Sequence, residues 1–323
     1  MAKTKISLVI PCYRSENTVK FVIDEIAAVM AGSEAYDYEI VAVNDCSPDN
    51  VWDVLMKCAD ENEHLTLLDL AKNRGRIAAL MAGFSIVTGD IVVVLDDDGQ
   101  CPMDHLFELV APLSGRCDVS IAKYPVKKQS AFKNFGSKVN EYMTCVMIDK
   151  PKKLYLANFM AMRRYVVEEI IKYTNPYPYL AGLVLRTTSR IVNVPMEERE
   201  RISGTTTYTF KKLFGHWMNG LTAFSVKPLR LASLCGVIAA LAGFALGAFT
   251  VIRKLINPAE ILSGYTSLMA VTLFIGGIIM LMLGMLGEYI GRSYISINKS
   301  PQYVIRETYR GDASERAENG DGE

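Results

Sequence analysis

Two long stretches without charge near the end of the chain constrain its fold more than any other feature. The first runs from Leu231 to Ile252, and the second runs from Ile261 to Ile290 with one charged residue, Glu288, near its end. A helix needs about 20 apolar residues to cross the hydrocarbon core of a bilayer. We therefore predict transmembrane helices over residues 229–253 and 261–290.

Basic residues around these stretches predict their orientation. Lysines and arginines occur on both outer flanks, while the short connection between the stretches carries Arg253 and Lys254. Flanks rich in Lys and Arg stay on the cytosolic side of a membrane. The apolar run near the N-terminus is too short for a signal peptide. We therefore expect an integral membrane protein with both termini in the cytosol.

The chain before residue 208 alternates between two kinds of segment. The segments ISLVIP, YEIVAVND, LTLLDLA and DIVVVLD have the composition of strands, and those between them carry apolar residues at helical spacing. This rhythm is typical of a mostly parallel sheet covered by helices on both faces. We predict a cytosolic α/β domain with a Rossmann-like sheet over residues 1–207.

Ligands of such sheets bind at the carboxyl ends of the strands. The four predicted strands end in polar or turn-forming residues, at 11–14, 44–47, 72–76 and 96–100. Because these ends meet at one edge of the sheet, the sequence predicts a polar ligand crevice there.

Three consecutive carboxylates, Asp96, Asp97 and Asp98, follow the fourth strand. Like charges this close repel and disfavour each other's ionisation. Asp96 and Asp98 can both point into the crevice, and carboxylate oxygens suit Mg²⁺ or Mn²⁺. A bound divalent ion would remove the repulsion. The alternative is a solvated turn, because this spacing also occurs by chance.

Composition argues against other classes of site. The chain has 35 basic and 35 acidic residues, so it lacks the basic field expected of a nucleic-acid-binding protein. Its seven cysteines are scattered without a C-x-x-C pair, and it has three histidines. A zinc site or a disulfide framework is therefore not expected.

Several motifs give the chain a specific resemblance. In order, LVIPCYRSENTV, VAVNDCSPDN, AKNRGRIAALMAGF and GDIVVVLDDDGQCP resemble the family-2 glycosyltransferases, which have the GT-A fold. VPMEERERISGTTTYTFKKL, AFSVKPLRLASLCG and MLGEYIGRSYISINKSPQYVIRE are similar to the polyprenyl-phosphate glycosyltransferases. That group includes undecaprenyl-phosphate glucosyl- and aminoarabinosyl-type transferases and is related to dolichyl-phosphate mannose synthase. The resemblance runs from Lys5 to about Arg306.

The resemblance implies an inverting transfer of a sugar from a nucleotide sugar, UDP-linked by resemblance, to polyprenyl (undecaprenyl) phosphate. The reaction would depend on Mg²⁺ or Mn²⁺ and would serve cell-envelope glycan assembly at the bacterial inner (plasma) membrane. A homo-oligomer, such as a tetramer, is also implied. The sequence does not identify the sugar.

The resemblance also assigns roles at the nucleotide-sugar site. Asp45 would accept a hydrogen bond from uracil, although a turn-capping aspartate is the alternative. Asp96 would face the ribose, and Asp98 would hold the metal together with Asp96 and Gln100. The remaining positions expected to line the nucleotide are Pro11, Tyr13, Glu16, Asn73 and Arg76.

On the acceptor side, the resemblance implies that Lys133 and Ser137 contact the lipid phosphate from one helix face. Relatives usually have arginine at the first position, and a solvated lysine is the alternative. Arg201 would close over the diphosphate. It is preferred to Arg199 because of its spacing from Gly204.

The chain departs from its relatives at several positions. Asp97 and Gly99 interrupt the usual D-A-D-L-Q, and we assign Asp97 no catalytic role. Thr207 stands in place of a lysine. No aspartate aligns before the AMRR segment, and Asp149 is the nearest. A carboxylate base is not required, because a phosphate monoester is mostly dianionic at neutral pH and is already nucleophilic.

The remaining segments complete the predicted organisation. Aromatic and basic residues over 208–228 predict an amphipathic helix in the membrane interface, with a core-facing helix as the alternative. Residues 291–323 are expected to form a cytosolic tail with a disordered end. Two other functions remain open, a processive polysaccharide synthase, although Q-x-x-R-W is absent, and a non-catalytic membrane scaffold.

Overall fold

The computed structural model describes residues 3–125, 145, 150–175, 178–197, 199, 227–256, 264–298 and 300–311. The chain forms two compact units. Unit 1 contains Met1–Thr209 and Lys299–Glu323, and unit 2 contains Phe210–Asn298. The chain therefore leaves unit 1 once and later returns to it.

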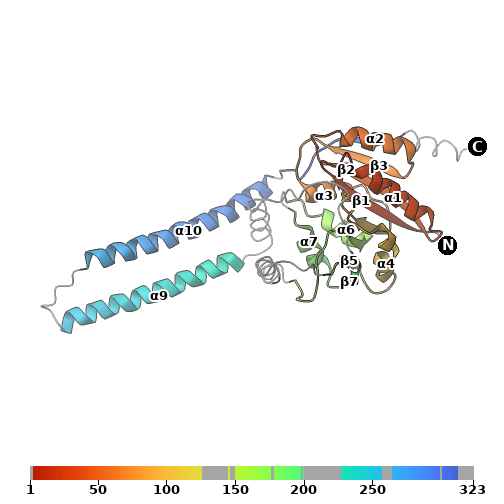
Figure 1. The fold of residues 1–323 in the computed structure, drawn as a ribbon. Helices are drawn as coiled ribbons and strands as arrows, with labels where there is room; N and C mark the ends of the chain where they lie inside the picture. Colours follow the sequence, from red (N-terminus) through yellow and green to blue (C-terminus); the bar gives the residue numbers. More distant parts are fainter. Residues whose placement is uncertain are drawn as a thin grey trace, which may run out of the picture. The chain divides into compact units, whose positions relative to one another are not determined.

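Unit 1 is built on an eight-stranded sheet with the order β7-β5-β6-β4-β1-β2-β3-β8. Figure 1 labels five of its strands, β1, β2, β3, β5 and β7. Its centre is parallel and consists of β1 (Thr4–Cys12), β2 (Tyr36–Asn44), β3 (Leu65–Leu70) and β4 (Ile91–Val94). β1 lies between β2 and β4, so the order of the strands reverses there. A ligand crevice is expected at such a point, at the carboxyl ends of the strands. The predicted mostly parallel α/β fold is confirmed.

Both faces of the central strands are covered by helices. Leu8 and Ile10 of β1 are fully buried in the core that includes α1 (Val19–Ala31) and α2 (Val51–Glu61). Val9 points to the opposite face, where α3 (Arg76–Phe84) packs. Burial on both faces explains why the strand segments have continuous apolar runs.

The outer strands complete unit 1. β6 (Met160–Arg163) is antiparallel to β4 and β5 (Val119–Lys123), and β7 (Ile191–Pro195) is parallel to β5. At the other edge, β8 (Ile305–Arg310) pairs antiparallel with β3. β8 was not predicted from the sequence, and it lies in the segment 291–323 that was assigned to a cytosolic tail. The remaining helices are η1 (Met103–His105), α4 (Leu106–Val110), η2 (Ala111–Ser114), α6 (Arg164–Ile171) and α7 (Leu180–Thr187).

Unit 2 contains two long helices, α9 (Lys227–Ile256) and α10 (Tyr265–Ile297). They are in contact, and Gly236 faces the side chain of Met282. By length and composition, one described segment qualifies as a membrane span, Phe274–Ile297, with 24 residues and a mean hydropathy of 1.7. The shorter apolar segment Gly236–Ala245 lies in α9. The interfacial helix predicted over 208–228 lies outside the described residues, except for its last two positions.

Glu39 of β2 connects its own strand to β1 and to the segment that precedes β4, near the amino ends of these strands. Its carboxylate accepts hydrogen bonds from Ser7 Oγ at 2.5 Å and from the Thr88 backbone N–H at 2.6 Å, and it pairs with Lys5 Nζ at 2.8 Å. Burial raises the pKa of Glu39, but the hydrogen bonds from Lys5, Ser7 and Thr88 outweigh it and lower the pKa to about 2. The carboxylate is therefore more stable ionised in the folded protein than in the unfolded chain.

Replacing Glu39 with glutamine is expected to destabilise unit 1 by up to about 3 kcal/mol near neutral pH, the free energy that corresponds to a pKa shift of this size. The folded-state pKa of Glu39 lies below the usual 4.5. Its contribution is therefore complete above about pH 5 and is lost as the pH falls toward 2. Thermal unfolding midpoints in detergent should differ between the two proteins at neutral pH and converge in acid. A difference that stays constant with pH would contradict the assignment.

Candidate functional site

The carboxyl ends of the central strands come together as a set of hydrogen-bonded loops. Tyr13, after β1, donates its backbone N–H to Asp97 Oδ2 at 3.0 Å, after β4. Arg14 donates its backbone N–H to Ser47 Oγ at 2.8 Å, after β2. These bonds close the loops around the point where the strand order reverses. The predicted strand ends therefore lie at one edge of the sheet.

Asp45, after β2, is 2% exposed. Its two carboxylate oxygens accept the backbone N–H groups of Arg74 and Gly75, each at 2.8 Å. Gly75 has φ +88°, a left-handed conformation that favours glycine. Burial raises the pKa of Asp45, and these two hydrogen bonds oppose the rise. These contacts fit the alternative stated for Asp45, that it holds a turn. The turn that it holds is the one that precedes α3, and not the turn in which Asp45 itself lies.

Asp96 is held from two sides. Its Oδ1 pairs with Arg76 Nε at 2.6 Å, and its Oδ2 accepts a hydrogen bond from Asn158 Nδ2 at 2.7 Å. Arg76 begins α3, and Asn158 lies just before β6, whose first residue pairs with the last residue of β4. Both oxygens of Asp96 are thus engaged, and its charge is matched by that of Arg76.

Arg76 also presents an unsatisfied donor at the site. Its Nη2 is buried and has no hydrogen-bond acceptor in the described part of the chain. A buried donor without an acceptor is costly. An anionic ligand at this edge of the sheet would supply the acceptor.

Asp97 points back to the loop after β1. Its hydrogen bond from Tyr13 holds that loop. Burial raises the pKa of Asp97 to about 6, and the charges of Asp96 and Asp98 add to the rise. In the described structure, Asp97 therefore holds the loop after β1.

Asp98 and Gln100 form the turn that follows. The backbone N–H of Gln100 donates to Asp98 Oδ1 at 3.2 Å, and Gly99 between them has φ +73°. Gln100 also exchanges hydrogen bonds with the backbone of Arg199, at 3.3 Å in each direction. The acidic turn is therefore linked to the segment that follows β7.

Arg199 has a structural role. Its guanidinium pairs with Glu25 and, at 2.7 Å, with Asp104. The hydrogen bond and charge of Glu25 raise the pKa of Arg199 further above its usual range. The guanidinium of Arg199 is therefore engaged in two ion pairs. Arg201, the predicted lid residue, lies outside the described residues, as do Lys133 and Ser137.

The other predicted nucleotide residues lie in these loops or, in the case of Pro11, near the end of β1. Pro11 is buried opposite Val43, and Tyr13 is 43% exposed. Glu16 Oε2 accepts the backbone N–H of Asn50 at 2.9 Å, at the start of α2. Asn73 donates to the backbone carbonyl of Asp45 at 3.1 Å. In the described residues, Glu16 and Asn73 therefore connect loops of this edge.

In the part of the chain that the structure describes, no group of three or more His, Cys, Asp or Glu side chains is arranged to hold a metal ion. Protein sites for Mg²⁺ often supply only one or two carboxylates, with the remaining ligands from phosphate and water. Asp98 is suited to that kind of site.

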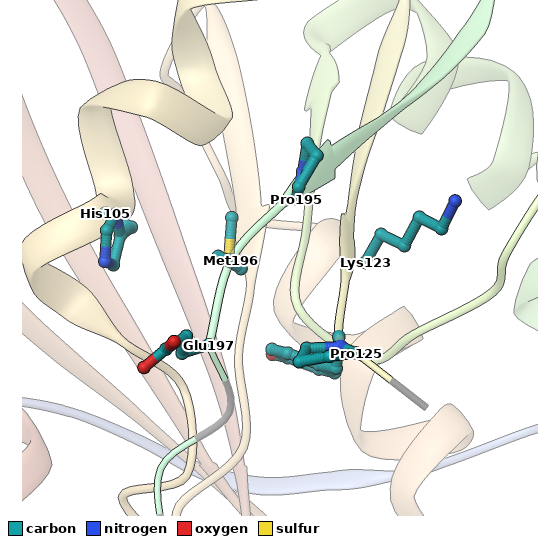
Figure 2. Close-up of a pocket in the computed structure, with 7 residues that line it drawn as sticks. His105, Lys123, Pro125, Pro195, Met196 and Glu197 are labelled. Carbon is teal, nitrogen blue, oxygen red and sulfur yellow. The ribbon is translucent and has the colours of Figure 1, made fainter. Parts of the chain in front are cut away.

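A pocket of about 580 Å³ lies at the carboxyl ends of β5 and β7 (Figure 2). His105 and Lys123 stand on opposite sides of it, with Met196 between them, as Figure 2 shows. The other lining residues are Tyr124, Pro125, Pro195 and Glu197. The lining therefore combines apolar side chains with the ionisable side chains of His105, Lys123 and Glu197.

Two residues at this edge of the sheet, Asn158 and Arg306, were not among the site residues predicted from the sequence. Asn158 lies in LYLANFMAMRR, the segment noted for lacking an aspartate, and it contacts Asp96 across 62 positions of sequence. The signal that could have identified Asn158 from the sequence was its position just before a buried strand. Arg306 lies on the unpredicted strand β8.

Comparison with known proteins gives two family matches. The model described as Glycosyl transferase family 2 matches residues 7–171, about half of the chain. The model described as GtrB C-terminal hairpin matches residues 227–293.

Two solved structures are similar to part of this chain. Glucosyl-3-phosphoglycerate synthase from Mycobacterium tuberculosis, in complex with Mn²⁺, UDP and phosphoglyceric acid, is 16% identical with a TM-score of 0.50, over 68% of this chain and 76% of that chain. Mannosyl-3-phosphoglycerate synthase from Rubrobacter xylanophilus is 18% identical with a TM-score of 0.49, over 71% of this chain and 74% of that chain. At these identities the first likeness indicates a shared fold.

Proposed function

Because the chain belongs to glycosyl transferase family 2 and has the GT-A fold, we propose that it transfers a sugar from a UDP-sugar to polyprenyl phosphate. The observation that carries the nucleotide-sugar half of this proposal is Nη2 of Arg76, beside Asp96, which is buried and has no acceptor among the described residues. It lies where the order of the strands reverses, at the edge where α/β sheets bind ligands. A nucleotide diphosphate provides the acceptor oxygens that this donor lacks.

The loops supply the remaining groups that a UDP-sugar requires. Asp45 is buried, and each of its oxygens has accepted one hydrogen bond. A carboxylate can accept about four, so Asp45 can still take the imide N–H of uracil. Asp96, oriented by Arg76 and Asn158, would accept a hydrogen bond from a ribose hydroxyl.

The acidic turn fits a divalent cation. Asp98 provides a carboxylate in the loop after β4, with Gln100 beside it, while Arg76 already balances the charge of Asp96. Mg²⁺ or Mn²⁺ bound there would stabilise the charge that develops on the departing nucleoside diphosphate. The structure that contains UDP and Mn²⁺ is of a protein with the same fold, which is consistent with this assignment.

The membrane part of the proposal rests on chain connectivity. β8, after α10, is hydrogen-bonded to β3 of unit 1, so the chain must return to the side of the membrane from which it left. The number of crossings between residues 209 and 299 is therefore even. One segment of α10 qualifies as a span by composition, so a second crossing is needed. α9 has 30 residues and a length of about 45 Å, which suffices.

This topology favours two crossings and a catalytic unit in the cytosol, with basic flanks on the same side. The match of residues 227–293 to the GtrB C-terminal hairpin agrees with a hairpin of two helices. We place the phosphate of the lipid acceptor at the membrane surface, with Lys133 and Ser137 as its predicted contacts and Arg201 as the residue that closes over the diphosphate of the donor. A dianionic phosphate can attack the sugar without a carboxylate base.

Incubation of the full-length protein with undecaprenyl phosphate, Mg²⁺ or Mn²⁺, and a panel of labelled UDP-sugars should transfer label to a chloroform-soluble lipid. The label should depend on the metal and should carry one sugar per lipid. A long labelled polymer would instead identify a processive polysaccharide synthase. If no donor is bound or consumed, a non-catalytic scaffold would be the better description.

A further inference from the structure

The C-terminal strand contributes a charged side chain to the edge of the sheet. In the pairing of β8 with β3, Asp69 is opposite Glu307 and Leu70 is opposite Ile305, with a shift of register between them. Arg306 is therefore the extra residue of an irregularity in the ladder. A bulge of this kind re-aims the side chain of the extra residue.

Arg306 is directed at a buried carboxylate. Its Nη1 lies 3.0 Å from Asp69 Oδ2, and Asp69 is only 4% exposed. Its Nη2 donates to the backbone carbonyl of Ala71 at 3.3 Å and lies 3.9 Å from Cys46 Sγ. A buried carboxylate is costly unless it is paired. The pairing cation comes from a segment that follows the two long helices.

Asp69 in turn orients Asn44, the last residue of β2. Asn44 Nδ2 donates to Asp69 Oδ1 at 2.8 Å, which directs Asn44 Oδ1 toward the backbone N–H of Ser47 at 3.1 Å. Two residues of the adjoining loops, Arg14 and Cys46, have φ of +57° and +48°. Such conformations are costly for residues other than glycine and persist only where neighbouring contacts hold them.

We propose that Arg306 is a positioning residue for the nucleotide site. Acting through Asp69 and Asn44, it holds the 44–47 loop in the shape that presents Asp45. The loop that receives the nucleotide is thus completed by the strand that follows the membrane hairpin. This inference rests on the proposed function, because it takes the ligand to be a nucleoside diphosphate.

The test measures binding of UDP to the full-length protein in detergent, in the presence of Mn²⁺, by titration calorimetry. Arg306→Ala should weaken UDP binding about tenfold, because buried Asp69 would lose the exposed cation that pairs with it and that orders a binding loop. In the transfer assay, KM for the UDP-sugar should rise while kcat changes less than about twofold. Arg306→Lys should restore part of the affinity, because an ammonium can pair with Asp69 as a point charge. Glu307→Ala, an exposed position on the same strand, is the matched control and should bind UDP as the wild type does.

A double-mutant cycle separates this role from a general loss of folding. Asp69→Asn removes the buried charge that Arg306 balances and keeps an acceptor for Asn44. If Arg306 acts through Asp69, Asp69→Asn combined with Arg306→Ala should bind UDP no worse than Arg306→Ala alone. Additive losses, or wild-type affinity in Arg306→Ala, would overturn the inference while leaving the proposed function in place. A wild-type protein that binds no UDP would overturn both.

Discussion

Replacement of Asp98 with asparagine is expected to reduce kcat/KM for sugar transfer about a thousandfold. The carboxylate is the residue that we assign to the metal, and charge stabilisation by a catalytic metal is worth several kcal/mol. Asparagine is similar in size and can still accept the hydrogen bond that Asp98 Oδ1 receives from the Gln100 backbone. The loss of kcat/KM should therefore reflect removal of the negative charge and not a change in the conformation of the turn. Transfer of labelled sugar to lipid at several Mn²⁺ concentrations measures it.

Asp97→Asn is the matched control for this experiment, because it removes the same charge one position away. Asp97 accepts a backbone hydrogen bond from Tyr13, and asparagine retains an acceptor for it. We expect a loss of at most about fivefold, since no metal contact is removed. UDP binding should also lose its dependence on Mn²⁺ in the Asp98 variant and keep it in the Asp97 variant. Equal losses in the two variants would argue against Asp98 as the metal ligand.

Replacement of Asn158 with aspartate is expected to reduce transfer about a hundredfold at pH 8, with partial recovery toward pH 6. The new carboxylate would stand where Asn158 Nδ2 now lies 2.7 Å from Asp96 Oδ2. Two carboxylates this close cannot both ionise without strong repulsion, so one of their pKa values rises. At lower pH the pair can share a proton and the hydrogen bond to Asp96 returns. The ratio of variant to wild-type activity should therefore rise as the pH falls.

Asn158→Ala provides the comparison without an added charge. It removes one of the two donors that orient Asp96 and leaves the pair with Arg76 at 2.6 Å intact. Its loss of activity should be smaller, and its ratio to the wild type should not change with pH. If Asn158→Asp were as active as the wild type across this range, Asn158 would have no part in orienting Asp96.

The order of the segments along the chain was sufficient to predict the fold class. Strand-like segments such as ISLVIP and DIVVVLD alternate with segments of helical periodicity, and both signals depend on residues only a few positions apart. The position of the ligand edge followed from the same pattern, because parallel strands bring their carboxyl ends together. Residue order also showed that two long apolar segments come after the α/β unit. The family match then agreed with the motifs that carry the resemblance.

The partners of the site residues depended on the tertiary structure. Local sequence shows three neighbouring aspartates, but it does not show that Asp96 is held by Arg76 and Asn158, or that Asp97 is bound to the loop after β1. Strand β8 was missed for a related reason. Its sequence, IRETYR, is polar and has exposed positions because it is an edge strand.

Periodicity and composition arise from contacts within a helix or strand, so they can be recognised from sequence alone. The contact between Arg306 and Cys46 joins residues 260 positions apart, and it exists only because β8 pairs with β3 in a particular register. Such a register is set by the packing of the whole sheet. The sequence therefore determined the α/β class and the edge that carries the site, while the folded chain decided which side chains meet there.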